Sequence, residues 1–137
     1  MIYVDKKTGE RVTRHTMQKR MFESYGNSNP DELAITEHFL LSVEDWEMGQ
    51  IVITTHLNNE IENNPDAQRE IAEAFNRYKM YDWGDSDRND QEENDQAILK
   101  ADRRILASYT LNSLNKEIWI ITEWDRSVTT LLFPEDY

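Results

Sequence analysis

The chain has 137 residues, the length of one domain or of one small domain with an appendage. Its 27 acidic and 15 basic side chains give a formal net charge of −12, which argues against direct binding to duplex nucleic acid, because such binders need a basic footprint. There is no cysteine, no apolar run near the ~20 residues that span a bilayer, and no signal-like segment after Met1, so disulfides and thiolate catalysis are excluded and a cytoplasmic location without membrane contact is expected.

The first 26 residues predict a small hairpin-helix module. Residues 3–12 predict a short β-hairpin whose turn is Lys7-Thr8-Gly9. Thr13 is a good N-cap for a helix that begins at Arg14, and Gly26 is placed to end that helix.

A second helix is predicted after a turn. In Asn29-Pro30 the asparagine is expected to cap this helix and the proline to occupy its first position, with the helix reaching about Leu41. The acidic stretch 44–49 then has the composition of a loop. We therefore predict an N-terminal appendage over 1–48 and a core domain over 49–137.

The second half of the chain predicts an α+β fold. A β-branched run over 51–55 indicates a strand, and Asn64 before Pro65 indicates a helix with an apolar stripe. A helix is expected over 91–101, and the last three strands are expected over 104–111, 117–122 and 127–133. The expected architecture is an antiparallel three- to four-stranded sheet packed by helices, with the hairpin-helix appendage at its N-terminus.

The acidic charge is unevenly distributed. Residues 1–25 carry a net charge of +3, residues 26–50 carry −6, and the stretch from Asp82 to Asp95 has seven carboxylates against Arg88 alone. Such a run is either a solvated surface or a surface that imitates a phosphate backbone and binds a basic groove. In the second interpretation the partner-binding residues are Asp82, Asp85, Asp87, Asp90, Glu92, Glu93 and Asp95, with Glu44, Asp45 and Glu47.

Catalytic and cofactor motifs are weak. Asp85 begins a calcium-loop-like pattern, but Asp90 stands where the loop needs glycine, and we predict no metal site and no cofactor. The one constellation suited to acid/base work is Glu123, Asp125 and Arg126 between the last two predicted strands. The same residues are also typical of a tight turn held by an arginine, so a catalytic site is not predicted from them.

The C-terminal half resembles a family of small proteins carried by plasmids, phages and integrative elements of Gram-positive bacteria. The resemblance covers about residues 49–137. It is carried by Tyr81-Asp82-Trp83-Gly84-Asp85, Arg104-Ile105-Leu106-Ala107-Ser108-Tyr109, Ile118-Trp119-Ile120-Ile121-Thr122-Glu123, Asp125-Arg126-Ser127-Val128-Thr129-Thr130 and Leu132-Phe133-Pro134-Glu135-Asp136-Tyr137.

This resemblance implies a mobile-element protein in a bacterial host, and small acidic proteins of such elements include anti-CRISPR inhibitors. The first hypothesis is therefore a non-catalytic inhibitor that binds the basic nucleic-acid or PAM-binding groove of a CRISPR-associated nuclease with its guide RNA. Two alternatives remain open. One is a small hydrolase or nuclease acting through Glu123, Asp125 and Arg126, and the other is a structural or regulatory oligomer of the element, built through an open sheet edge.

Overall fold

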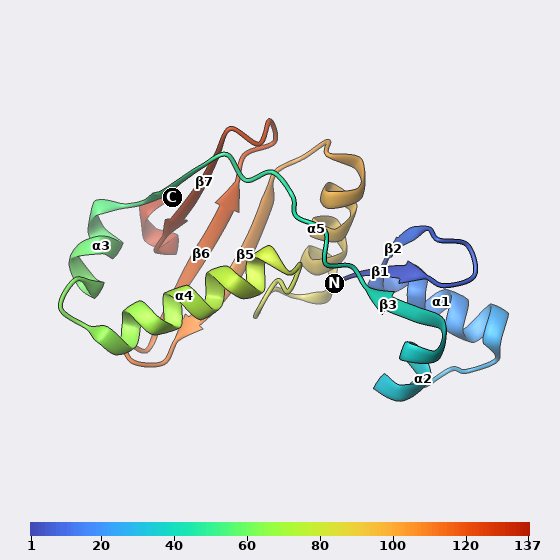
Figure 1. The fold of residues 1–137 in the computed structure, drawn as a ribbon. Coiled ribbons are helices and arrows are strands. Elements are labelled where there is room, and N and C mark those ends of the chain that lie inside the picture. Colours follow the sequence, from blue (N-terminus) through green and yellow to red (C-terminus); the bar gives the residue numbers. More distant parts are fainter. The chain divides into compact units, whose positions relative to one another are not determined.

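The computed structural model describes all 137 residues, which divide into two compact units, Met1–Glu44 and Asp45–Tyr137. The division falls at the start of the acidic loop in which the sequence places its domain boundary. Both units combine helices with sheets, and the α+β prediction is confirmed (Figure 1).

The first unit is a three-stranded antiparallel sheet with two helices. Its elements are β1 (Ile2–Asp5), β2 (Arg11–Thr13), α1 (Arg14–Tyr25), α2 (Glu32–His38) and β3 (Phe39–Leu41), with strand order β2-β1-β3. Thr13 caps α1 and Gly26, at φ 67°, ends it, as predicted. Met17, Met21, Val12 and Phe39 form the buried core of this unit.

The prediction for the second helix is wrong at both ends. Asp31, rather than Asn29, accepts a hydrogen bond from the backbone N–H of Ala34 and caps α2, so Pro30 precedes the helix. The sequence offers two capping residues two positions apart, and the acidic one is used. Residues 39–41, predicted to be helical, form strand β3 because Phe39 fits the core at the register that pairs β3 with β1.

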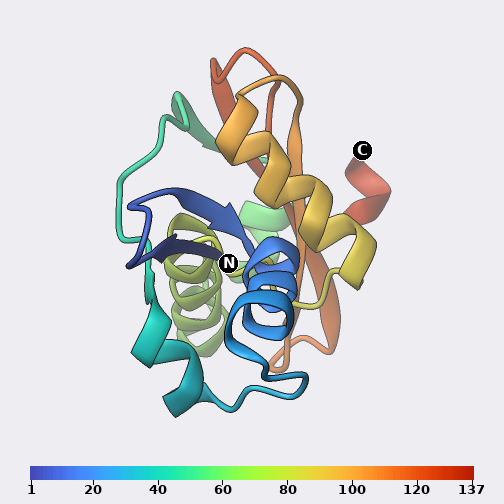
Figure 2. The same cartoon turned by 90° about the vertical axis from the view of Figure 1, so that its right-hand side faces the viewer.

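The second unit is a four-stranded sheet in the order β4-β7-β6-β5. Its elements are β4 (Gln50–Ile53), α3 (Thr55–Ile61), α4 (Pro65–Lys79), α5 (Arg88–Lys100), β5 (Ile105–Leu111), β6 (Lys116–Thr122), β7 (Val128–Leu132) and the 3₁₀ turn η1 (Pro134–Asp136). Seen from the β5 side, α4 covers one face of the sheet and η1 lies at the opposite face (Figure 2).

Two features of this unit differ from expectation. The sheet is mixed rather than antiparallel, because β4 pairs in parallel with β7, the strand furthest from it in sequence. Helix α3 was not predicted, because Thr54 and Thr55 continue the β-branched pattern of the strand. Thr54 is instead the N-cap of α3, which buries Leu57 and Ile61.

A chain of buried hydroxyl groups connects α4 to the sheet and to the loop before β4. Tyr78 Oη lies 2.7 Å from Thr122 Oγ1, which lies 2.7 Å from Thr129 Oγ1. Thr129 donates to the carbonyl of Met48 at 2.6 Å. Because each hydroxyl has one proton, Thr122 must donate to Thr129 and Tyr78 must donate to Thr122. The direction of every bond in this hydroxyl chain is therefore fixed.

We expect that direction to set the cost of breaking the chain. Thr122→Val leaves the buried Tyr78 hydroxyl without an acceptor and should lower the free energy of unfolding by about 1–3 kcal/mol. Tyr78→Phe removes only the terminal donor and should cost less than Thr122→Val, about 1 kcal/mol. All four tryptophans lie in this unit, so urea unfolding followed by tryptophan fluorescence measures its stability.

The double variant is the control for this assignment. When Tyr78→Phe and Thr122→Val are combined, no buried donor is left unpaired, so the loss should be smaller than the sum of the two single losses. Additive losses, or a larger loss for Tyr78→Phe than for Thr122→Val, would contradict the assigned direction.

Candidate binding surface

The acidic segment begins in a loop that is pressed against β5. Trp83 is fully buried, and Gly84, at φ 65°, forms a bridge with Ser108. A Cβ added at Gly84 would lie 2.3 Å from the carbonyl oxygen of Ser108, so only glycine permits this approach. The loop and the start of α5 are therefore fixed by backbone contact with the sheet.

Two of the predicted binding carboxylates serve the fold instead. Asp95 is 1% exposed and accepts a hydrogen bond of 2.8 Å from Trp83 Nε1, which removes it from the predicted binding surface. Asp95 lies on the buried side of α5, next to the buried Asn94, and the acidic composition of the segment does not indicate this burial. Asp82 is half-buried and pairs with Arg77 at 2.9 Å. Burial opposes its charge, but hydrogen bonds from Arg77 and Gly84 outweigh burial and lower the pKa of Asp82.

The other carboxylates of the segment remain near solvent. Asp87 is the N-cap of α5 and accepts from the N–H of Asp90, while Asp85 accepts from the hydroxyl of Thr110 at 2.8 Å. Glu93 pairs with Arg103. The exposed acids at this end of α5 are Asp85, Asp87, Asp90 and Glu93, with Glu92 half-buried and bonded to Gln96. Three of them, Asp85, Asp87 and Asp90, have only Arg88 as a cationic neighbour in sequence.

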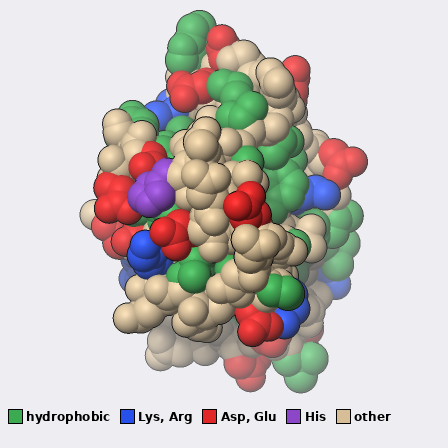
Figure 3. Space-filling model, turned by 90° about the vertical axis from the view of Figure 1, so that its left-hand side faces the viewer, with side chains coloured by type: hydrophobic (Ala, Val, Ile, Leu, Met, Phe, Trp, Pro, Cys, Tyr) green, Lys and Arg blue, Asp and Glu red, His purple; other side chains and the backbone are tan.

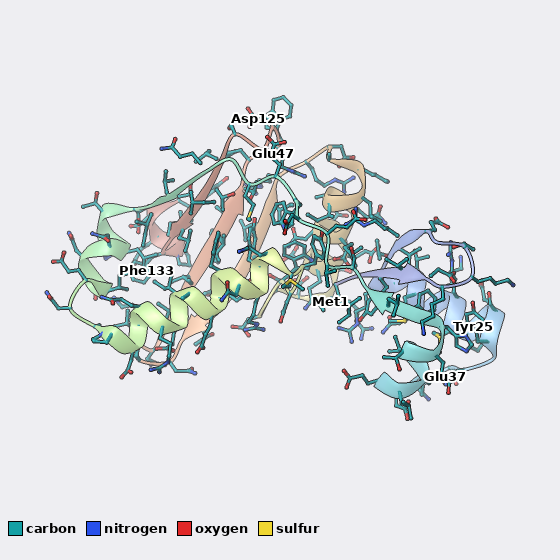
Figure 4. The ribbon with its side chains drawn as sticks, viewed as in Figure 1. Met1, Tyr25, Glu37, Glu47, Asp125 and Phe133 are labelled. Atoms are coloured by element: carbon teal, nitrogen blue, oxygen red, sulfur yellow. The ribbon has the colours of Figure 1, made fainter.

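The acidic residues before β4 divide between the two units. Glu44 belongs to the first unit and pairs with Arg11 at 3.3 Å, whereas Asp45 and Glu47 are exposed in the second unit. A Cβ added at Gly49 would lie 2.2 Å from the carbonyl oxygen of Ser127. The loop 45–49 therefore runs directly beside the 123–127 hairpin, at the end of the sheet where Figure 4 labels Glu47 and Asp125.

Arg126 organises this end of the sheet. It has φ 60°, and its guanidinium donates to the carbonyls of Ala97 and Arg103 at 2.9 and 2.8 Å, and to that of Glu123 at 3.1 Å. Burial lowers its pKa. Asp125 accepts from the N–H of Ser127, as a turn residue does. Arg126 thus donates to backbone carbonyls and not to a carboxylate. Glu123, Asp125 and Arg126 therefore have the geometry of a tight turn held by an arginine.

The hairpin also exposes a large aromatic side chain. Trp124 is 66% exposed between Glu123 and Asp125. Its exposure is not predictable from the sequence, because the alternation within a strand does not tell which side the tip of a hairpin faces. Tryptophan is enriched among the residues that carry the binding energy of protein interfaces.

A histidine-carboxylate pair also lies outside the predicted sites. His56 Nδ1 lies 2.8 Å from Asp136 Oδ1, and the hydrogen bond from His56 lowers the pKa of Asp136. Asp136 also accepts from Thr54, and the His56 ring contacts Phe133. The pair joins residues 80 positions apart, so no sequence spacing signals it. Acidic side chains and a histidine lie close together on the face drawn in Figure 3.

A polar groove of about 560 Å³ lies between α4 and β5. Its charged groups are engaged internally. The side chain of Ser113 and the backbone N–H groups of Ser113 and Asn112 donate to Glu70, which lowers the pKa of Glu70. Arg77 pairs with Asp82. No group of three or more histidine, aspartate and glutamate side chains is arranged to hold a metal ion. No helix is long and apolar enough to cross a membrane.

Comparisons with protein-family models, with curated proteins and with solved structures gave no match.

We expect Arg126→Met to destabilise the second unit by about 2–4 kcal/mol, because it leaves several partly buried carbonyls without their charged donor. Arg88→Met, an exposed change of the same type, should stay within about 0.5 kcal/mol of the wild type. Tryptophan-monitored unfolding compares the two. Equal stability of the two variants would contradict this structural role of Arg126.

Proposed function

We propose that the protein is a non-catalytic inhibitor that binds a basic groove of a host defence nuclease, of the CRISPR-associated type with its guide RNA, by charge mimicry. The observation that supports it is the group of exposed carboxylates at the start of α5: Asp85, Asp87 and Asp90. They are held by a helix cap and a contact with β5 rather than by a flexible tail. Fixed negative charges of this kind can replace phosphates in a groove lined by lysine and arginine.

The charge of the whole second unit supports the same proposal. Residues 45–137 contain 20 acidic and nine basic side chains, a net charge of −11 out of the total of −12. A field of this sign accelerates association with a basic partner and repels nucleic acid. Trp124, between Glu123 and Asp125, adds an apolar anchor of the kind that carries binding energy once water is excluded.

The hydrolase alternative has less support. Arg126 directs its donors to backbone carbonyls, and Asp125 accepts from the N–H of Ser127, so both have structural duties. Asp125 is hydrogen-bonded to both the backbone and the side chain of Ser127, which is the arrangement of a turn-forming aspartate. Binding therefore remains the better proposal.

The test is inhibition of guide-loaded Cas9-type nucleases by the triple variant Asp85→Asn, Asp87→Asn and Asp90→Asn. Asparagine caps helices as well as aspartate and can still accept from Thr110, so the fold should be retained. We expect the triple variant to inhibit cleavage of a PAM-containing duplex about 10-fold to 100-fold more weakly than the wild type, and wild-type inhibition to weaken as salt rises.

The matched control is Glu23→Gln, Glu32→Gln and Glu62→Gln, which makes the same change of net charge at other exposed positions. This control should inhibit like the wild type. Equal loss in both variants would indicate a non-specific charge effect, and undiminished inhibition by the aspartate variant would contradict mimicry by α5. If the wild-type protein displaces duplex DNA from none of the guide-loaded nucleases tested, the proposal of a CRISPR-associated target is wrong.

A further inference from the structure

Strand β4 leaves one side of its backbone unpaired. It is an edge of the four-stranded sheet, with β7 as its only neighbour. The N–H groups of Gln50 and Thr54 donate to carbonyls of the β7 side. Because successive residues of a strand direct their polar groups to opposite edges, Ile51 and Ile53 direct theirs to the free edge. That edge therefore offers two donors and two acceptors to another strand.

The side chains along this edge are apolar and exposed. Ile51 is 46% and Ile53 is 37% exposed, although they share a sheet face with the buried Thr129 and Leu131. No charged residue occurs from Gly49 to Thr55. Natural sheet edges are commonly protected by charges, prolines or bulges. Strand β4 contains no charge and no proline, and its register with β7 is uninterrupted.

We propose that the β4 edge pairs antiparallel with the β4 edge of a second copy. The twofold axis passes midway between the Val52 residues of the two copies. In this register Ile51 lies opposite Ile53 of the second copy, and Ile53 lies opposite its Ile51. Both pairs are of the hydrogen-bonded kind, so every polar group that faces the free edge gains a partner. The four isoleucine side chains lie on the same face and extend the two cores into one.

The occupant is a second copy because the strip is uncharged and self-complementary. A basic or acidic partner would find no opposite charge between Gly49 and Thr55, whereas another copy supplies the same apolar strip by symmetry. The remaining surface of each second unit carries −11 and repels its counterpart, so the chains can approach most easily where charge is absent. Salt screens that repulsion within about 10 Å at 0.1 M, and self-association should strengthen as salt rises.

This salt dependence is opposite to that of the inhibitor activity. The dimer does not depend on the proposed function, since β4 and the α5 carboxylates are different surfaces. Either proposal can fail while the other holds.

The first test is the solution mass of the full chain by sedimentation velocity, from about 10 µM to about 500 µM and at about 0.05 M and about 0.5 M NaCl. The wild-type mass should rise from 16.3 kDa toward twice that value with concentration, and more so at high salt. I51K should remain at 16.3 kDa throughout. L33K makes the same change at a 74% exposed site on α2 and should associate like the wild type.

The second test fixes the register. I53E alone should also remain monomeric, but an equimolar mixture of I51K and I53E should associate, because the introduced lysine and glutamate would lie opposite each other across the axis. Circular dichroism of each variant checks that it is folded. A wild-type mass of 16.3 kDa under every condition, or association of I51K equal to that of the wild type, overturns the dimer. A monomeric mixture beside a dimeric wild type overturns the register.

Discussion

The second unit depends on the buried hydroxyl chain from Tyr78 through Thr122 and Thr129 to the carbonyl of Met48. Buried polar groups are costly unless they are paired, so a sequence that places three hydroxyls in a core requires one arrangement of α4, β6 and β7. The last bond reaches beyond the sheet and satisfies a carbonyl of the loop before β4. A single line of donors therefore connects a helix, two strands and a loop.

That constraint determines where the acidic surface lies. With the loop held by Thr129 and by the close contact of Gly49 with Ser127, Glu47 is fixed beside the 123–127 hairpin. Arg126 ties this hairpin to the end of α5 through the carbonyl of Ala97. The carboxylates near Trp124 and those along α5 are therefore carried by one rigid frame. A rigid arrangement of charge binds with less loss of conformational entropy than a disordered acidic tail does.

Local signals predicted much of this fold and little of the site. Caps at Thr13 and Asn64 and the alternation in β5 and β6 are short-range features, and the elements they indicate are present. The parallel pairing of β4 with β7 joins residues almost 80 positions apart, and no local pattern encodes it. The composition of the sequence shows the acidic run. It does not show that Asp95 is buried while Asp90 is exposed, because this depends on which side of the helix each residue occupies and on the hydrogen bond from the Trp83 indole to Asp95.

The distribution of charge connects the two proposed surfaces. A unit with net charge −11 repels every copy of itself, and this long-range repulsion keeps its acidic end available for a basic partner. The uncharged stretch from Gly49 to Thr55 is where that repulsion is weakest at contact, and it coincides with unpaired backbone and exposed isoleucine. Edge pairing would place the two acidic ends on opposite sides of a twofold axis, where neither needs to approach the other. The same excess of carboxylates that favours a basic partner thus disfavours self-association of the second unit except where its surface is neutral, as it is along β4.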